Sequence, residues 1–433
     1  MQYYSLNNHA LKVSFTTAVV QGLAPDRGLY FPESLPAPDL HFIQALEKYS
    51  DQEIAYQVIA PFVGDDIPET VLKQIISDTL SFPFPVNEVE PNVYALELFH
   101  GPTLAFKDVG ARFMAGCLGY LLRNDQRPVT VLVATSGDTG GAVAAGFHQV
   151  PGINVVILYP SGKVSTLQEK QLTTLGGNIR ALEVQGSFDD CQRMVKSAFL
   201  DAALQQHVLL TSANSINVAR WLPQMFYYFL AVKQLKALGK QNPVFSVPSG
   251  NFGNICAGIL ASILGLPIAH FIAATNVNDT VPRYLENGDY KPSAPIATLS
   301  NAMDVAEPSN FVRVLQLFEQ NFPALQAKLS GYAFDDTATV QAMEAMYKNN
   351  GYLLDPHGAV GYLGLKKYLA LHPETTGVFL ETAHPVKFAD TAPHALKAHI
   401  HIPARVQALY DLPKQSIPLP ATDEALKAWL LQQ

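Results

Sequence analysis

Short apolar segments alternate with helix-like segments through the middle of the chain, and this alternation most constrains the fold. Strand-like runs such as VTVLVAT (129–135) and NVVILYP (154–160) are each followed by a helical pattern, and the order repeats as far as IAHFIAAT (268–275). Apolar, β-rich runs separated by helices are typical of parallel sheets that are covered on both faces. The pattern predicts a doubly wound α/β fold.

The regions on either side of this alternation differ from it. The first hundred residues contain helix-like stretches between Pro-rich joints at 31–40 and 81–91, and the region after residue 301 mixes helical patterns with short strands. Clusters of proline mark joints between regular elements. We predict an N-terminal layer in residues 1–90, a smaller α/β domain in residues 91–240 and a large α/β domain in residues 241–433.

Composition excludes several classes of protein. The 433 residues are 48% hydrophobic and 15% charged, which suits a large buried core. The formal net charge is −8 and no Lys/Arg cluster occurs, so we expect no nucleic-acid partner. Residues 244–277 contain no charged residue, but their helix has only about a dozen residues and a membrane span needs about 20. We therefore expect no membrane association.

Cysteine usage and the first residues bear on location. Cys117, Cys191 and Cys256 are an odd number without CxxC spacing, which favours a reducing compartment. The N-terminal segment lacks the basic and apolar regions of a signal peptide, so a cytoplasmic location is expected. No HExxH or other metal spacing occurs, and we expect no catalytic metal.

Two small-residue loops follow predicted strands, where ligands of open parallel sheets bind. TSGDTGG (135–141) follows one strand and PSGNFGN (248–254) follows another. Such turns are common ways to start a helix. Glycines, through positive φ and the missing side chain, also let backbone N–H groups approach an anion that the helix dipole favours. Neither loop has a Walker A or GxGxxG pattern, so a small phosphate or carboxylate is the predicted ligand.

One lysine stands out in HGPTLAFKD (100–108). Lys107 follows the apolar pair Ala105-Phe106 and precedes an apparent helix start at Asp108. Apolar neighbours and the positive end of a helix dipole both disfavour an ammonium ion, so a neutral amine should be available near pH 7. An amine beside a phosphate site suggests pyridoxal 5'-phosphate, an aldehyde cofactor held as a Schiff base.

Motifs spread in order across most of the chain resemble those of the threonine synthase family, and VSFTTAVVQGLAPDRGLYFPE (13–33) resembles its long, bacterial form. The resemblance implies a pyridoxal-phosphate enzyme of fold type II, the tryptophan-synthase β-like fold, with doubly wound parallel sheets in two domains and an N-terminal layer. The motifs are HGPTLAFKD (100–108), ATSGDTG (134–140), NSIN (214–217), PSGNFGN (248–254), AATNVNDTVPR (273–283), LSNAMDV (299–305), DPHGAV (355–360) and TAHPVKF (382–388).

The same resemblance implies a reaction. The family's enzymes are carbon-oxygen lyases acting on phosphates, and they convert O-phospho-L-homoserine and water into L-threonine and phosphate. The route is γ-elimination followed by β-addition of water, at the end of threonine biosynthesis. The expected assembly is a monomer or a homodimer.

The resemblance also implies roles for individual residues within the matching motifs. Lys107 matches the family's catalytic, cofactor-bearing lysine, and Thr382 matches the residue that partners the pyridine nitrogen. The implied cofactor-phosphate cradle is Gly250, Asn251, Phe252 and Gly253.

The substrate side is implied in the same way. Ser136, Asp138 and Thr139 look like the loop that faces the amino-acid end of the substrate. The implied site for the substrate's phosphate contains Asn214, Ser215 and Arg220, with Lys163 as a second candidate cation.

The resemblance leaves three residues without an implied role. Glu381 departs from the small residues usual at its position, and we expect its side chain to point away from the cofactor. His357 and His384 have no assigned role. Competing functions are a serine or threonine dehydratase or a cysteine synthase of the same fold, a catalytically silent paralogue that binds phosphorylated metabolites, and a lysine-independent phosphate-binding enzyme.

Overall fold

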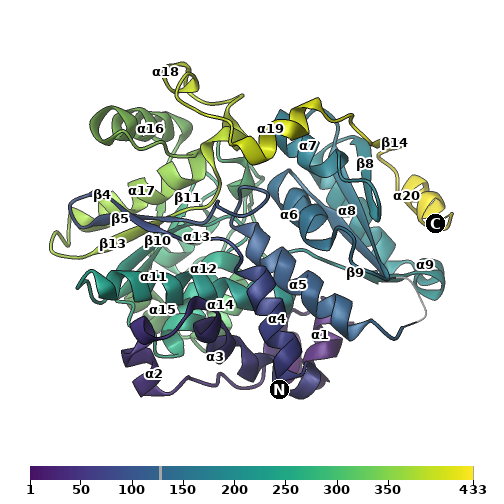
Figure 1. The fold of residues 1–433 in the computed structure, drawn as a ribbon, viewed down its shortest axis with the longest axis horizontal. Coiled ribbons are helices and arrows are strands. Elements are labelled where there is room, and N and C mark those ends of the chain that lie inside the picture. The colour runs from purple at the N-terminus through teal and green to yellow at the C-terminus, as the bar shows by residue number, and fades with distance from the viewer. Residues whose placement is uncertain (126–128, 433) are drawn as a thin grey trace.

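Two sheets organise the chain. The computed structural model describes residues 1–125 and 129–432. Figure 1 shows a larger sheet on the left and a smaller one on the right, with the N-terminal elements below them. This is the α/β architecture that the alternation predicts.

The smaller sheet has five strands, and every neighbouring pair is parallel. Alternate residues of a strand point to opposite faces. In the strand 129–134, Val131 and Val133 pack in one core with Phe147 of α6 (Asp138–Phe147). Leu132 and Ala134 of the same strand pack in another core with residues of α8 (Phe188–Leu200). The sheet is therefore covered on both faces. In spatial order its strands are β14 (Ile417–Pro420), β8 (Ile179–Gln185), β7 (Ile153–Pro160), β6 (Val129–Ala134) and β9 (Leu209–Thr211).

The end of the sequence returns to this smaller sheet. β14 pairs in parallel with β8, and Leu426 and Leu430 of α20 (Asp423–Leu430) pack in the same core as α8 (Phe188–Leu200). Figure 1 shows this C-terminal segment, in yellow, against the teal elements of the smaller sheet.

The larger sheet has six strands, of which only the edge strand β4 runs antiparallel to its neighbour. Helices α16 (Asp336–Asn350) and α17 (Pro356–Leu369) lie above it in Figure 1, and α11 (Met225–Ala237) and α12 (Gly253–Ile263) lie below it. Its strands in spatial order are β12 (Leu329–Ala333), β11 (His270–Thr275), β10 (Val244–Pro248), β13 (Gly377–Glu381), β5 (Val93–Glu97) and β4 (Val86–Glu90). The division of the chain at residues 90 and 240 stays a prediction. In the structure β5 belongs to the larger sheet and β14 to the smaller one, so each sheet takes strands from more than one of the predicted segments.

The N-terminal layer contains a feature that the sequence analysis did not anticipate. Besides helices, it holds a three-stranded antiparallel sheet made of β1 (Gln2–Ser5), β2 (Asn8–Ser14) and β3 (Tyr30–Pro32). The expected helices are present as well, and the sequence analysis did not name the strands because strands of three to seven residues carry too little periodicity to be recognised.

The helical segment that follows β9 is interrupted. The chain forms α10 (Val218–Trp221), a 3₁₀ turn (Leu222–Gln224) and α11 (Met225–Ala237). Pro223 lacks the backbone N–H that a continuous helix would use, which favours an interruption at this point.

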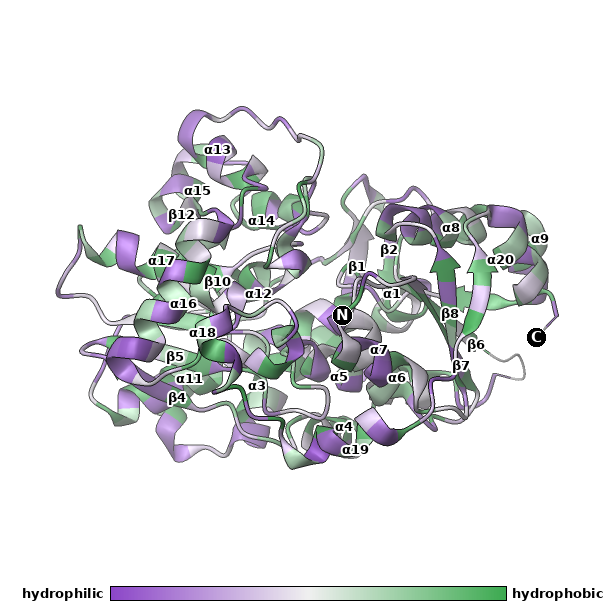
Figure 2. Cartoon of the chain, turned by 90° about the horizontal axis from the view of Figure 1, so that it is seen from above, coloured by the Kyte–Doolittle hydropathy of each residue, from purple (hydrophilic) through white to green (hydrophobic). Residues whose placement is uncertain are grey.

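Figure 2 shows hydrophobic and hydrophilic residues mixed along the remaining helices. They are α1 (Phe15–Gln21), α2 (Leu40–Gln44), α3 (Asp51–Val63), α4 (Glu69–Thr79), α5 (Lys107–Leu121), α6 (Asp138–Phe147), α7 (Thr166–Thr173), α9 (Ala202–His207), α12 (Gly253–Ile263), α13 (Thr280–Asn287), α14 (Phe311–Leu317), α15 (Phe322–Lys328), α16 (Asp336–Asn350), α17 (Pro356–Leu369), α18 (His394–Lys397) and α19 (Ala404–Asp411).

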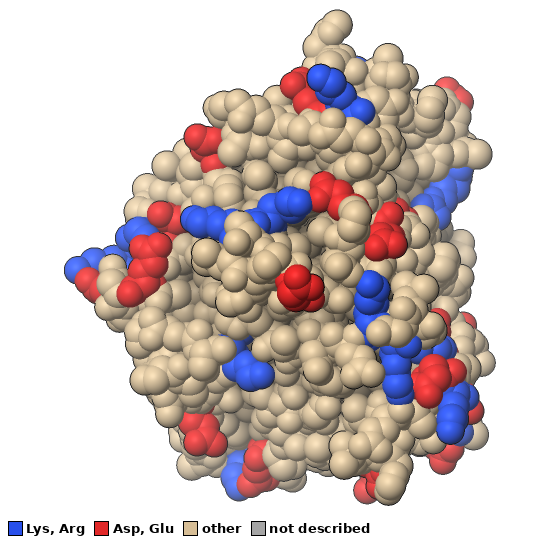
Figure 3. All heavy atoms as spheres, turned by 90° about the vertical axis from the view of Figure 1, so that its left-hand side faces the viewer, with Lys and Arg blue, Asp and Glu red and all other residues tan. Residues whose placement is uncertain are grey.

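Charges of both signs are interspersed on the face shown in Figure 3, without a large area of one sign. Among residues 1–125 and 129–432, no helix is long and apolar enough to cross a membrane.

Candidate active site

A single cavity of about 1470 Å³ brings together every site residue that the sequence analysis named. It opens where strands of both sheets end, since Ala134, Pro160 and Pro248 at the carboxyl ends of β6, β7 and β10 line it. This is the edge at which parallel sheets bind ligands. The named residues that line the cavity are Lys107, Ser136, Asp138, Thr139, Lys163, Asn214, Ser215, Arg220, Gly250, Asn251, Phe252, Gly253 and Thr382.

Lys107 is the first residue of α5 and is held by the segment that follows β13. The Phe106 N–H donates to the Thr382 carbonyl at 2.8 Å, and the His384 N–H donates to the Leu104 carbonyl at 3.0 Å. Burial lowers the pKa of Lys107 to about 8. Within the described residues, no hydrogen bond or ion pair engages its amino group. A substantial fraction of this amine is therefore neutral and free near physiological pH.

The loop 250–253 has a backbone that the sequence analysis placed incorrectly. Neither glycine adopts positive φ; Phe252 does, with φ 61° and ψ 11°, immediately before α12 begins at Gly253. A left-handed conformation costs a bulky L-residue about 1–2 kcal/mol, and such strain is typical of functional sites. Gly250 is required for a different reason, because a Cβ there would lie 2.4 Å from the Ala302 carbonyl oxygen.

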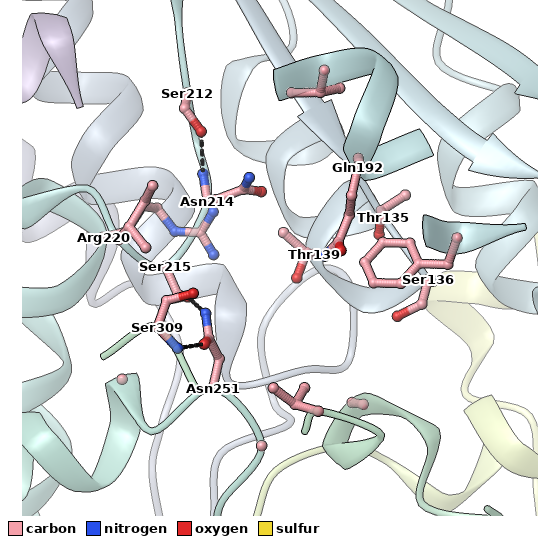
Figure 4. A pocket seen from close by; sticks show the side chains of 18 of the residues that line it. Thr135, Ser136, Thr139, Gln192, Ser212, Asn214, Ser215, Arg220, Asn251 and Ser309 are labelled. Atoms are coloured by element: carbon pink, nitrogen blue, oxygen red, sulfur yellow. Dashed lines mark hydrogen bonds between the residues drawn. The ribbon is translucent and has the colours of Figure 1, made fainter. Parts of the chain in front are cut away.

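Asn251 links this loop to the segment that carries Asn214 and Ser215. Its Nδ2 donates to Ser215 Oγ at 2.6 Å, and its Oδ1 accepts from the Ser309 N–H at 2.5 Å, as Figure 4 shows. Asn310 Nδ2 also donates to Ser215 Oγ, at 3.3 Å. The loop 250–253 and the segment 214–215 thus form one connected wall of the cavity.

Arg220 adds a cation to this wall. Its side chain is 4% exposed, and burial lowers the pKa of its guanidinium to about 10. One terminal nitrogen donates to the Ala213 carbonyl, but Nε is buried and has no partner within the described residues. An unpaired buried donor costs free energy unless a ligand supplies an acceptor. The arrangement suits an anion in the cavity.

The opposite wall belongs to the smaller sheet. Ser136 and Thr139 lie across the cavity from Arg220 and Asn251 in Figure 4. Lys163 is exposed in the turn after β7, at the rim of the cavity.

Asp138 has an environment that its motif alone did not indicate. It begins α6 but is buried, and its Oδ1 accepts from Lys387 Nζ at 2.8 Å and from Gln168 Nε2 at 2.9 Å. Burial would raise the pKa of this carboxyl, but the charges of Lys387 and Lys107 outweigh burial and hold it well below its usual range. Asp138 is therefore ionised.

Glu381 and Thr382 face different surroundings. Thr382 lines the cavity, whereas Glu381 does not and is fully buried beside the start of α17. A Cβ at Gly358 would lie 1.9 Å from Glu381 Oε1, so only glycine fits there. Burial, reinforced by the charge of Asp355, raises the pKa of Glu381 well above its ordinary value. Its carboxyl group is directed away from the cavity, in line with the expectation.

The two histidines also differ in placement. His357 lines the cavity; its Nδ1 pairs with Asp355 Oδ1 at 2.7 Å, and its Nε2 accepts from the Ala302 N–H at 3.2 Å. His384 does not line the cavity, and burial lowers its pKa to about 4. His384 is consequently neutral over the physiological range.

Sequence reasoning missed several polar groups that support the site. Lys387, Gln168 and Asn310 each contact a predicted site residue but come from distant segments. Lys387 does lie within the TAHPVKF motif, between the apolar residues Val386 and Phe388, and that context was a usable signal. Gln168 and Asn310 gave no comparable signal. Among the described residues, no group of three or more His, Cys, Asp or Glu side chains is placed to hold a metal ion.

The cavity fits an aldehyde cofactor that carries a phosphate. Lys107 supplies the amine, and the loop 250–253 supplies close backbone approach at the start of an 11-residue helix. Arg220, a cation that lines the cavity and forms no ion pair within the described residues, marks a second position for an anion. One amine and two anion positions are the donors that such a cofactor and a phosphorylated substrate need.

Comparisons with known proteins agree with this geometry. Residues 77–382 match the family described as pyridoxal-phosphate dependent enzyme, residues 2–80 match the threonine synthase N terminus, and residues 358–430 match the threonine synthase C-terminal family. Threonine synthase from Escherichia coli (strain K12) is 47% identical over 431 residues, which cover 100% of this chain and 99% of that protein. Threonine synthase from Haemophilus influenzae is 46% identical over 432 residues, with full coverage of both chains.

Solved structures give the same result. The crystal structure of threonine synthase from Escherichia coli superposes with a TM-score of 0.93 and covers 100% of both chains. The structure of PLP-bound threonine synthase from Brucella melitensis is 34% identical, covers 100% of this chain and 99% of that one, and has a TM-score of 0.92. The chain therefore belongs to the threonine synthase family of pyridoxal-phosphate-dependent enzymes, with the fold type II architecture.

Proposed function

We propose that the protein converts O-phospho-L-homoserine and water into L-threonine and inorganic phosphate. One observation carries this proposal: a single cavity joins the free amine of Lys107 to two anion positions, one at the loop 250–253 and one at Arg220. A dehydratase or a cysteine synthase would share the lysine and the cofactor cradle but would not need a site for a phosphate on the substrate. The second position favours a substrate with its own phosphate.

The proposed roles follow the geometry. Lys107 would bond to the cofactor's aldehyde, and the loop 250–253 would hold the cofactor's phosphate. Thr382 would place its hydroxyl at the pyridine nitrogen; a hydroxyl cannot stabilise a pyridinium as a carboxylate would. When bound, pyridoxal phosphate supplies an electron sink for negative charge at the α- and β-carbons of the substrate.

The residues of the chain would do the rest of the work. Arg220, with Asn214 and Ser215, would bind the substrate's phosphate and hold it while it leaves, and Lys163 at the rim is a second candidate cation. Ser136 and Thr139 would orient the amino-acid end. Lys107 would take and return protons at Nζ, a role suited to an amine whose pKa of about 8 lies near working pH.

Location and assembly remain proposals too. The three cysteines are free and buried, which is compatible with a reducing, cytoplasmic location. A monomer or homodimer is proposed from the family resemblance.

Replacement of Lys107 tests the function. Lys107→Ala should reduce phosphate release from O-phospho-L-homoserine to background, because it removes both the cofactor attachment and the proton carrier. Borohydride treatment of the wild-type protein should fix the cofactor's label on Lys107, as read by peptide mass spectrometry. A label on another lysine, or release of ammonia from serine or threonine faster than release of phosphate, would contradict the proposal.

A further inference from the structure

Lys387 lies next to the proposed catalytic groups, yet nothing in the proposed reaction uses it. It belongs to the 3₁₀ turn Pro385–Phe388 and is 0% exposed. Its amino group contacts Asp138 Oδ1 at 2.8 Å, the Thr103 carbonyl at 2.7 Å and Gln171 Oε1 at 2.9 Å. An ammonium group has three N–H donors and no acceptor, so these three acceptors match it completely. Lys387 is thus a buried lysine whose amino group is fully engaged by acceptors of the protein.

Lys107 is the opposite case. Its amino group has no hydrogen-bond or ion-pair partner within the described residues, and burial lowers its pKa to about 8. The charges that act on it are the Asp138 carboxylate, which favours the ammonium form, and the cations Arg220 and Lys387, which oppose it. Its protonation state therefore depends on how strongly Asp138 is neutralised.

Asp138 is the shared group. Oδ1 accepts from both Lys387 and Gln168, while Oδ2 has no hydrogen-bond partner within the described residues. Asp108, the other carboxyl group near Lys387, accepts from the Thr103 N–H and hydroxyl at 2.9 and 2.5 Å, and burial raises its pKa. Asp138 is thus the carboxylate that Lys387 pairs with.

We propose that Lys387 is a positioning residue that neutralises Asp138 and so keeps Lys107 available as a neutral amine. Without Lys387, the nearest cation to compensate the buried Asp138 carboxylate would be Lys107 itself. A buried pair of that kind would hold Lys107 as an ammonium ion, which can neither bond to an aldehyde nor accept a proton. The inference rests on the proposed role of Lys107 and adds a charge-balancing partner to it.

The test measures the amine of Lys107 directly. The full-length chain, freed of cofactor by dialysis against hydroxylamine, is treated briefly with a trace of acetic anhydride between pH 6 and 10, and acetylation at Lys107 is read by peptide mass spectrometry. The wild-type midpoint should lie near pH 8. Lys387→Met should raise it by about one unit, so that acetylation of Lys107 at pH 7 falls about tenfold. Lys387→Arg is the matched control, since it keeps the charge and should stay within about twofold of wild type.

A second substitution separates charge from packing. In Lys387→Met/Asp138→Asn the uncompensated carboxylate is gone as well, so the Lys107 midpoint should return to the wild-type value or lower. A merely structural role for Lys387 would not be rescued by a further change. Asp138→Asn alone should lower the midpoint, and this variant tests the same coupling if Lys387→Met does not fold.

The outcomes are distinct. A midpoint unchanged in Lys387→Met, or unrestored in the double variant, overturns the inference, as does an unchanged midpoint in Asp138→Asn. If borohydride fixes the cofactor on a lysine other than Lys107 in the wild type, the proposed function itself fails, whatever the acetylation shows.

Discussion

Arg313 and Arg220 are both buried arginines, and they differ in how far their N–H donors are satisfied. Burial lowers the pKa of each to about 10, and neither forms an ion pair within the described residues. Arg313 donates to the carbonyls of Tyr30 and Ile216 and to Asn310 Oδ1, and its guanidinium stacks 4.5 Å from the Trp221 ring.

Arg220, in contrast, has one carbonyl partner and a buried Nε that nothing satisfies among the described residues. It lines the cavity, whereas Arg313 does not. Burial alone therefore does not mark a functional arginine. The distinguishing feature is a buried guanidinium with few protein partners that lines a cavity.

The largest effect is expected at the satisfied arginine. Arg313→Met should lower the free energy of unfolding by about 3 kcal/mol or more, because it leaves three acceptors from three segments buried without donors, each costing about 1–3 kcal/mol. Urea denaturation measures this. A loss below about 1 kcal/mol would mean that Arg313 is less important to the fold than its contacts suggest.

At the unsatisfied arginine, activity rather than stability should change. Arg220→Ala should lower kcat/KM for O-phospho-L-homoserine by about 10- to 150-fold, equivalent to about 1.5–3 kcal/mol for a charge-assisted contact to phosphate. The absorbance of the bound cofactor should stay near that of wild type. Arg220→Lys should recover only part of the activity, since it lacks the planar fork. Wild-type turnover in Arg220→Ala would move the substrate-phosphate site to Lys163.

The glycines of the loop 250–253 provide a similar contrast between a packed and an open position. A Cβ at Gly250 would lie 2.4 Å from the Ala302 carbonyl oxygen, whereas a Cβ at Gly253 would have its nearest neighbour at 3.4 Å. Gly250→Ala should therefore weaken retention of pyridoxal phosphate by about tenfold, and Gly253→Ala should change it little. Equal effects in equilibrium dialysis would show that the loop's packing against Ala302 is not what shapes the cradle.

The smallest effect is expected where an unmet polar atom lies away from the cavity. Glu381 Oε1 has no partner among the described residues, but Glu381 does not line the cavity. Its pKa is raised in the folded protein by burial, so the unfolded chain releases this proton at lower pH than the folded chain. Because Glu381 ionises first in the unfolded chain, the free energy of unfolding falls progressively as pH rises above the ordinary carboxyl pKa of about 4.5.

Glu381→Gln cannot ionise and should gain stability relative to wild type as pH rises from 5 to 8, with little change in kcat/KM. Urea midpoints of both proteins at the two pH values measure the difference. An equal difference at pH 5 and pH 8 would show that Glu381 does not hold its proton in the folded state.

Much of the site could be predicted because its residues lie in local motifs at the ends of strands. A motif of a few residues identifies each of three parts of the site: Lys107, the loop 250–253 and the segment 214–220. The sheet topology then brings them to one edge.

The missed features depend on contacts between distant segments. Lys387 contacts Asp138 although the two residues lie far apart in the sequence, and Asn310 likewise contacts Ser215 from a distant segment. The positive φ in the loop 250–253 was assigned to glycine by propensity, but the surrounding packing holds Phe252 there. Tertiary contacts overrule local preference at such positions.

β14 has a consequence for how the protein reaches its native state. Strand β8 ends at Gln185, but the strand that covers its outer edge begins at Ile417. During synthesis, β8 therefore has no strand partner on that side until more than half of the chain has been added after it. Unpaired edges invite pairing with other molecules, and contacts so distant in sequence form slowly. Nascent chains that stall before β14 should be the aggregation-prone species of this protein, and they would be the ones that need a chaperone.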